Sequence, residues 1–418
     1  MTVQAMLFAL QRCQTAQEAL ELITFFLEKY GFLSSCCGRY PDGGEALLIA
    51  DPREAWDLEI FGVGNDWEPG KGKPGVIWAA QRIPDDHIFI MPNYPRIRKI
   101  DLDDPENFKV SSNYKQFAVD QGWYDPKSGE PFIWQEIYTY LPSDWNLPRI
   151  WLLCETFAPH YNNKGFENAW STGSGGRSMM KNSYESVRAT RFTAAYFPFS
   201  IRPEKKVSVQ DIIDFHRSTF EGTYWDMTAD LDWLVPDGKG GFVKSPLCTP
   251  FPNRYWRELL DITHHRNVCM TSAYAMISQL RGWLPDPLGG IYWFVVDNYK
   301  HSPYIPIYCG VTEISPLYNT YDPYQFDENS ARWVYDFVDT MLQMRYQDAV
   351  KDLFAVRDPF EASIYARQSE IEAEALELFD KNPQHSREYL TDYTRSLMQE
   401  AVKRYRELRY KLIVKYRN

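Results

Sequence analysis

The sequence lacks any run of about twenty apolar residues, so it contains no candidate membrane span. It has no CxxC motif and no HxxxH or HxH pair, spacings at which proteins often bind metals. The opening MTVQAMLFALQRCQTAQ lacks a basic region followed by an apolar core and a cleavage site, so it is no signal peptide. Low-complexity runs are also missing, which excludes a disordered or fibrous protein.

Positive charge is in short supply, because 45 Lys and Arg against 56 Asp and Glu give a net charge of −11. This balance argues against non-specific nucleic-acid binding, which needs a positive surface. Apolar residues are ample, since 44% of the chain is hydrophobic and 16% is aromatic. The 418 residues are enough for one large core or two ordinary domains.

The cysteines are few and odd in number, at seven. Two are adjacent and five are scattered: Cys36 and Cys37, then Cys13, Cys154, Cys248, Cys269 and Cys309. We interpret them as buried reduced thiols and not as a disulfide framework or a zinc site. The compartment stays unknown, because a sparse cysteine set does not exclude export.

Helical periodicity marks both ends of the chain. Met6, Leu10 and Cys13 recur at helical spacing, and Thr15 with Glu18 predicts a capping box for a second helix that Gly31 ends. A further helix is expected from Ser208, which could cap it with Asp211 three residues on, to about Phe220, and another over 330–353. The last sixty residues predict a helical hairpin that Asn382-Pro383 interrupts.

Between the helices the apolar period changes to two. Four strands joined by short turns are expected at 46–50, 55–61, 76–80 and 87–91, and short turns favour antiparallel pairing. In the second strand, Trp56, Leu58 and Ile60 alternate with two acids, which indicates a sheet with one buried face. A helix or strand is expected over 268–281 and a strand over 291–297.

Several motifs invite a functional interpretation that a structural one outweighs. Adjacent His264 and His265 could not easily share a metal ion. Gly173–Arg177 lacks the lysine of a phosphate loop. A glycosidase carboxylate pair could come from five acids: Asp85, Asp86, Asp101, Asp103 and Asp104. Acids at turns are nevertheless common in proteins without any catalytic role. The basic C-terminal tail could bind an acidic partner, but cations are also favourable near the C-terminus of a helix, where they meet the helix dipole. The tail contains Lys403, Arg404, Arg406, Arg409, Lys411, Lys415 and Arg417.

Asn93 stands in the segment MPNYPRI, where prolines restrict the backbone on both sides of a neutral amide. Such an amide is a good donor for an oxyanion, although an Asn between prolines is usually only part of a turn.

Seven segments, which include the strings EGTYWDMT, LRGWLPDPLGG and PIYCGVT, follow one another in a fixed order along most of the chain. They are Ala46–Glu59, Trp78–Ile97, Pro148–Pro159, Phe197–Thr228, Ser278–Trp293, Ser302–Ser315 and Ser330–Leu353. Together they resemble the cysteine dipeptidases of the N-terminal-nucleophile hydrolase superfamily, a family that includes dipeptidase A enzymes and secernins.

The resemblance implies an α+β fold of four layers (αββα), with two antiparallel sheets between helical layers. It implies a dipeptidase domain over 1–355 and a helical hairpin packed on it over 356–418. The implied activity is hydrolysis of dipeptides and other short peptides, with no metal, cofactor, nucleic-acid or membrane partner. The oligomeric state, including a homo-oligomer, stays undetermined.

The nucleophile in this family is a cysteine that begins the mature chain and uses its own α-amine as the base. By resemblance, Asn93 corresponds to an oxyanion donor, and Arg149 to an arginine that meets the substrate carboxylate or the transition state, or forms a structural ion pair. Arg191 is a rival for that role.

The chain departs from the family at its start, because Met1 lies directly in the helix that follows the nucleophile-bearing region. We therefore expect this chain to be the part of a dipeptidase that lies downstream of the nucleophile. We expect it to lack N-terminal strands and to be inactive alone. An incomplete reading frame explains this better than a separate nucleophile-bearing partner. The alternatives are a non-catalytic scaffold or subunit and a carbohydrate-active hydrolase.

Overall fold

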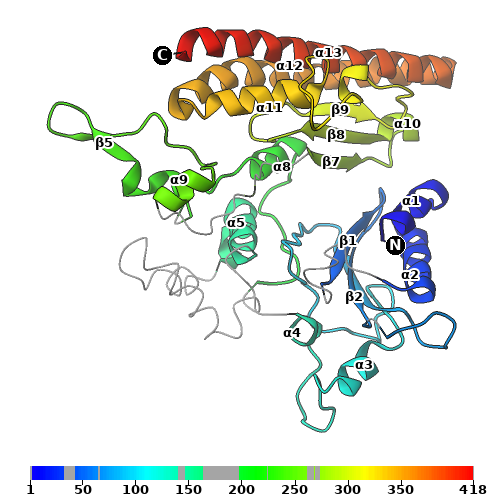
Figure 1. The fold of residues 1–418 in the computed structure, drawn as a ribbon. Helices are drawn as coiled ribbons and strands as arrows, with labels where there is room; N and C mark the ends of the chain where they lie inside the picture. The colour runs from blue at the N-terminus through cyan, green and yellow to red at the C-terminus, as the bar shows by residue number, and fades with distance from the viewer. Residues whose placement is uncertain are drawn as a thin grey trace. The chain divides into compact units, whose positions relative to one another are not determined.

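The structure is a computed structural model that describes residues 2–32, 43–64, 66–139, 146–162, 197–223, 225–260, 268 and 274–417. It combines helices with antiparallel sheets, which confirms the predicted α+β class (Figure 1). The chain divides into two compact units, with described residues up to Lys206 in the first and those from Val207 in the second. The four-layer arrangement and the missing strands stay predictions.

The first unit begins with the two expected helices, α1 (Thr2–Arg12) and α2 (Ala16–Tyr30). The Thr15 hydroxyl accepts a hydrogen bond from the Glu18 amide, as the capping motif predicted. Gly31 ends α2 at φ +82°, where any other residue would also push a Cβ into the Trp67 ring.

The buried side of α1 differs from the expected one. The spacing of Met6 and Leu10 suggested an apolar core face, yet Leu10 is 81% exposed. The small residues Ala5 and Ala9 are buried instead, in a core that α2 and the first sheet share. Periodicity located the helix but selected the wrong face, because small side chains permit the closer packing.

The first sheet is antiparallel in the order β1-β2-β3-β4. Its strands are β1 (Glu45–Ala50), β2 (Ala55–Gly62), β3 (Val76–Ile83) and β4 (Phe108–Val110). Three of the four predicted strands are present. The one over 87–91 is wrong, since Ile88 makes only an isolated bridge with Ile201. Pro84 and Pro92 lack amide protons at either end, which restricts any longer ladder.

Both faces of β2 are buried, which corrects the expectation of one buried face. Trp56, Leu58 and Ile60 pack with α1 and α2 in one core. Asp57 and Glu59 point to the other face and are also buried, at 0% and 1% exposure. The rest of the unit covers that second face, through α3 (Tyr114–Asp120), α4 (Trp134–Tyr138) and their neighbouring loops.

Two further helices complete the described part of the first unit, α5 (Leu147–Phe157) and the 3-10 turn η1 (Pro159–Tyr161). Pro148 lies in the first turn of α5, where a missing amide proton costs nothing. Most of α5 is buried, and Arg149 is only partly so.

The second unit starts with α8 (Val209–His216), which Ser208 and Asp211 cap reciprocally as predicted, although it ends before Phe220. Short elements follow: η3 (Met227–Ala229), η4 (Leu231–Trp233), β5 (Leu234–Pro236), β6 (Phe242–Lys244) and α9 (Arg254–Leu259). The antiparallel sheet β7-β8-β9 comes next, with strands β7 (Tyr274–Leu280), β8 (Gly290–Val296) and β9 (Ile305–Tyr308). The short helix α10 (Asp286–Gly289) lies between β7 and β8 in the sequence, and the 3-10 turn η5 (Pro316–Tyr318) follows β9.

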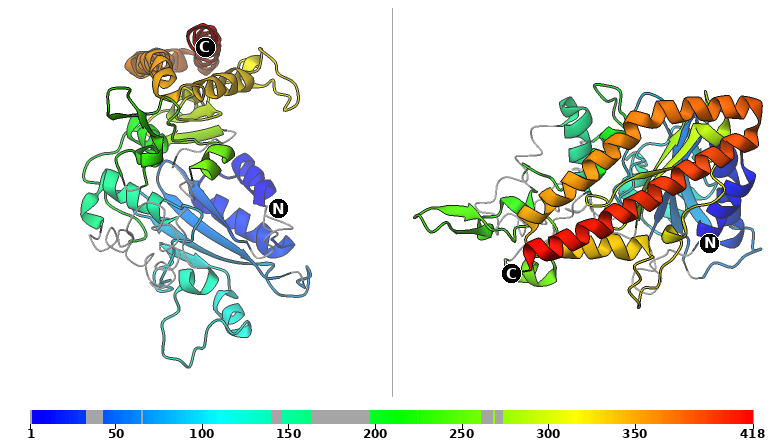
Figure 2. Two further views of the ribbon diagram at one scale, coloured as in Figure 1. Left: turned by 60° about the vertical axis from the view of Figure 1, so that its left-hand side comes forward. Right: turned by 90° about the horizontal axis from the view of Figure 1, so that it is seen from above.

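Three helices cover one face of this sheet (Figures 1 and 2): α11 (Ala331–Leu342), α12 (Tyr346–Lys381) and α13 (Pro383–Tyr416). The expected helix over 330–353 is therefore two helices, separated at Gln343–Arg345. The predicted hairpin is present, and Asn382 caps α13. The domain division at residue 355 falls inside α12 and stays a prediction. No helix in the described part of the chain has both the length and the apolar composition for a membrane crossing.

Candidate active site

The loop that carries Asn93 presents one polar side chain outward from a buried backbone. Asn93 is exposed, whereas its neighbours Pro92 and Tyr94 are buried. Its φ is +57°, in the left-handed region that asparagine tolerates better than most residues. An unusual backbone angle beside a projecting amide is a combination found at functional sites.

Side chains at the start of α5 hold this loop by donating hydrogen bonds to the loop's backbone carbonyl groups. Asn146 Nδ2 donates to the carbonyl oxygens of Pro92 at 2.9 Å and Asn93 at 3.1 Å. Arg149 Nη2 donates to the Pro92 oxygen at 2.8 Å. The loop conformation therefore depends on side chains more than fifty residues away in the sequence.

The Asn93 side chain is oriented by the same arginine. Arg149 Nη1 and Nη2 donate to Asn93 Oδ1 at 3.2 and 3.1 Å. A guanidinium group has only donors, so the amide oxygen must face it and the amide nitrogen must face away. Asn93 Nδ2 has no hydrogen-bond partner among the described residues, and it can donate to a bound molecule.

A buried carboxylate, Glu59, holds the other side of the loop. Its Oε1 accepts hydrogen bonds from the backbone amides of Arg96 and Ile97, the latter at 3.0 Å. Its Oε2 accepts from Trp134 Nε1 at 2.6 Å. Burial raises the pKa of Glu59, while these donors act in the opposite direction.

Two more charged groups are buried beside Glu59 and are incompletely paired. Nε and Nη1 of Arg96 have no hydrogen-bond partner in the described residues, and neither oxygen of Asp57 accepts a hydrogen bond there. The Asp57 and Glu59 carboxyl groups lie within hydrogen-bonding reach of each other. Burial, followed by repulsion from Glu59, raises the pKa of Asp57 well above its ordinary value. Burial lowers the pKa of Arg96 to about 10. Burial of these groups without full pairing costs free energy, and such groups are common at functional sites.

The described thiols do not have the properties of a nucleophile. Burial raises the pKa of Cys13 and Cys309, and it raises the pKa of Cys154 and Cys248 to about 11. A nucleophilic cysteine needs the opposite shift, because the thiolate is the reactive form. All four are free thiols. Cys154 and Cys248 are buried, as predicted, whereas Cys13 is only partly buried and Cys309 is exposed, which corrects the prediction for these two. The remaining cysteines, Cys36, Cys37 and Cys269, lie outside the described residues.

The other sequence-based candidates separate into two groups. Arg191, His264, His265 and the segment Gly173–Arg177 lie outside the described residues. Four of the five acids considered for a glycosidase accept hydrogen bonds or form ion pairs. Asp85 binds Arg82 at 2.6 Å, Asp86 binds Arg202 at 3.1 Å, and Asp101 and Asp104 accept bonds within their own turn.

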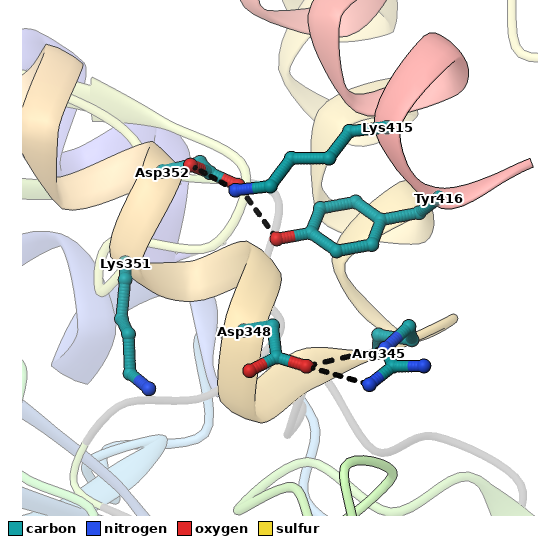
Figure 3. A pocket seen from close by; sticks show the side chains of 6 residues that line it. All are labelled: Arg345, Asp348, Lys351, Asp352, Lys415 and Tyr416. Carbon is teal, nitrogen blue, oxygen red and sulfur yellow. Dashed lines mark hydrogen bonds and ion pairs between the residues drawn. The ribbon is translucent and has the colours of Figure 1, made fainter.

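A cavity of about 370 Å³ lies at the open end of the α12–α13 hairpin (Figure 3). Its lining is charged and largely paired internally, and it consists of Arg345, Asp348, Lys351, Asp352, Lys415 and Tyr416. No cysteine, serine or threonine is among these residues. Within the described ranges, no three His, Cys, Asp or Glu side chains are arranged to hold a metal ion.

The structure thus joins Asn93 and Arg149, which the sequence had named separately. It adds Glu59, Arg96 and Asn146, which the sequence analysis did not single out. Glu59 was assigned to a solvent-facing side of β2, and its only signal was an acid in an otherwise apolar strand. Asn146 carried no signal, since its role depends on tertiary contact.

Known proteins are similar to this sequence over most of its length. The profile of peptidase family C69 matches residues 3–358. A probable dipeptidase of Salmonella dublin is 25% identical over 308 residues, which cover 72% of this chain and 53% of that protein. Dipeptidase A of Lactobacillus helveticus is 24% identical over 311 residues, 74% of this chain and 51% of that protein.

A third relative covers more of this chain. Probable dipeptidase B of Lactococcus lactis subsp. lactis (strain IL1403) is 24% identical over 392 residues, 93% of this chain and 68% of that protein. The matches span about half to two thirds of these relatives. The profile match extends from the first compact unit into the second, as far as residue 358. The chain therefore belongs to peptidase family C69.

Proposed function

We propose that the protein hydrolyses dipeptides and other short peptides by a cysteine N-terminal-nucleophile mechanism, in the four-layer fold expected from the sequence. Membership of peptidase family C69 and the names of the relatives support this activity. The observation that carries the proposal is the Asn93 amide, which Arg149 orients with its donor side outward.

In the proposed reaction, the cysteine sulfur adds to the peptide carbonyl carbon, and the oxygen becomes an anion that Asn93 Nδ2 stabilises. Collapse of this intermediate breaks the C–N bond. The thiol proton passes through the α-amine to the leaving nitrogen, and a thioester remains. Water then hydrolyses the thioester, which releases the acid and restores the thiol. Preorganised donors of this kind contribute about 10²- to 10³-fold to the rate.

The nucleophile in this proposal is none of the four described cysteines, since burial raises the pKa of each. We propose that it belongs to a segment upstream of this chain, so that the 418 residues alone do not hydrolyse dipeptides. Reading the nucleotide sequence before the Met1 codon tests this part. An upstream stop codon without a cysteine in frame contradicts it, and so does turnover by the purified chain that a thiol reagent abolishes.

The activity itself is tested with the protein made from its complete reading frame. We expect it to release alanine from alanyl-alanine, and we expect iodoacetamide to abolish this. Asn93→Ala should lower kcat about 10²- to 10³-fold. Asn319→Ala, which changes an exposed asparagine in the second unit, should leave kcat unchanged. A folded complete protein with no turnover favours a non-catalytic relative of the dipeptidases.

A further inference from the structure

Arg149 makes contacts that do not match a role in binding the substrate carboxylate. Both terminal nitrogens of its guanidinium donate to Asn93 Oδ1, and Nη2 also donates to the Pro92 carbonyl. A carboxylate bound in the usual two-pronged way would need these same donors. The substrate would therefore have to break the contacts that orient the amide.

We propose that Arg149 is a positioning residue that holds Asn93 Nδ2 where the oxyanion forms. This inference rests on the proposed function, in which Asn93 is the oxyanion donor. A cation on the amide oxygen also withdraws electrons from the amide, which makes its N–H groups stronger donors. The substrate carboxylate is then bound by a group other than Arg149.

The backbone of the loop does not depend on Arg149. Asn146 holds the carbonyls of Pro92 and Asn93, and Glu59 holds the amides of Arg96 and Ile97. Loss of Arg149 would leave these anchors in place but release rotation of the Asn93 side chain. Because Asn93 is exposed, its bonds to Arg149 contribute little to stability.

Kinetics on the complete protein separate the two roles, with alanyl-alanine and its C-terminal amide as substrates. If Arg149 positions Asn93, Arg149→Ala lowers kcat about 10- to 100-fold on both substrates and leaves both KM values unchanged. Arg149→Lys, which keeps one charged donor, should restore part of kcat. In an Asn93→Ala background, Arg149→Ala should have little further effect, because the two residues act as one unit.

A rise in KM for the free dipeptide alone would identify Arg149 as the carboxylate-binding group and overturn the inference. Additive effects of the two substitutions would also overturn it. No turnover by the wild-type protein would instead refute the proposed function.

A measurement on the 418-residue chain tests the positioning role without activity. With asparagine-selective ¹⁵N labelling, the side-chain order parameter of Asn93 should be high and should fall in Arg149→Ala. Asn319 serves as the exposed reference in the same spectra. An unchanged Asn93 order parameter would refute the positioning role whatever the kinetics show.

Discussion

Buried charges are treated differently in the two units. In the second unit, Arg217 donates to both oxygens of Glu361 at 2.8 and 2.7 Å, and Glu361 also accepts from the Tyr304 amide. In the first unit, Asp57 and Arg96 are also buried, but Nε and Nη1 of Arg96 have no partner in the described residues, and the Asp57 carboxyl has the like-charged Glu59 beside it. The free-energy cost of burying charged groups is thus offset by ion pairing in the second unit, and it is offset less completely in the first.

The paired and the incompletely paired charges lie in different kinds of place. The Arg217–Glu361 pair joins the end of α8 to α12, and Arg281–Glu372 joins α12 to the end of β7. These contacts connect scaffold elements. The incomplete cluster lies instead under the loop that presents Asn93. Proteins concentrate local conflict at functional sites, where geometry matters more than stability.

The largest expected effect concerns the fully paired charges. Glu361→Ala leaves Arg217 buried without its carboxylate, so we expect the free energy of unfolding to fall by about 3–5 kcal/mol. Urea denaturation followed by tryptophan fluorescence measures this change. The control Glu370→Ala removes an exposed glutamate, 4.0 Å from Arg367, and should cost less than about 1 kcal/mol. A loss of similar size in both variants would contradict the comparison.

The next effect concerns the buried Asp57 carboxyl in the first unit. Burial, and then Glu59, raises the pKa of Asp57 in the folded state, while the Arg96 guanidinium opposes the shift. The folded chain therefore keeps a proton that the unfolded chain releases above about pH 4. Stability from this group is present below that pH and is lost as the pH rises toward the folded-state pKa, by up to about 1.4 kcal/mol per pH unit.

Asp57→Asn removes this pH dependence while keeping the side-chain volume. Relative to the wild type, the variant should gain on the order of 1–3 kcal/mol between acid and mildly alkaline pH. Urea denaturation across a pH series measures the gain. Asp380→Asn, an exposed carboxyl on α12, is the matched control and should follow the wild-type curve. An Asp57→Asn curve parallel to the wild type would mean that Asp57 is ionised and solvated.

The features predicted correctly from the sequence are those that depend on local contacts. Thr15 with Glu18 and Ser208 with Asp211 form their caps, and Asn382-Pro383 separates the two long helices. Each signal acts within a few residues, so the identity of the neighbours determines the outcome. The strand expected at 87–91 failed because pairing needs a distant partner, and only Ile201 supplies one.

The candidate site shows the same limit. Asn93 and Arg149 were each identified through family resemblance, but their bond joins residues 56 positions apart and had no local signal. Glu59 was placed on a solvent-facing side because alternation in β2 cannot reveal a second covering layer. The sequence therefore identified the donor, and the tertiary structure identified what orients it.

The smallest expected effect concerns a charged contact whose two charged groups, Asp352 and Lys415, remain accessible to water. At the open end of the hairpin, Asp352 accepts hydrogen bonds from Lys415 and from the Tyr416 hydroxyl, the latter at 2.7 Å (Figure 3). Tyr416→Phe should cost about 0.5–1.5 kcal/mol in urea denaturation, because water can replace the lost donor. Tyr324→Phe, at a side chain that is 97% exposed, is the control and should change nothing. If Tyr416→Phe costs as much as Glu361→Ala, burial is not what separates strong from weak charged contacts in this protein.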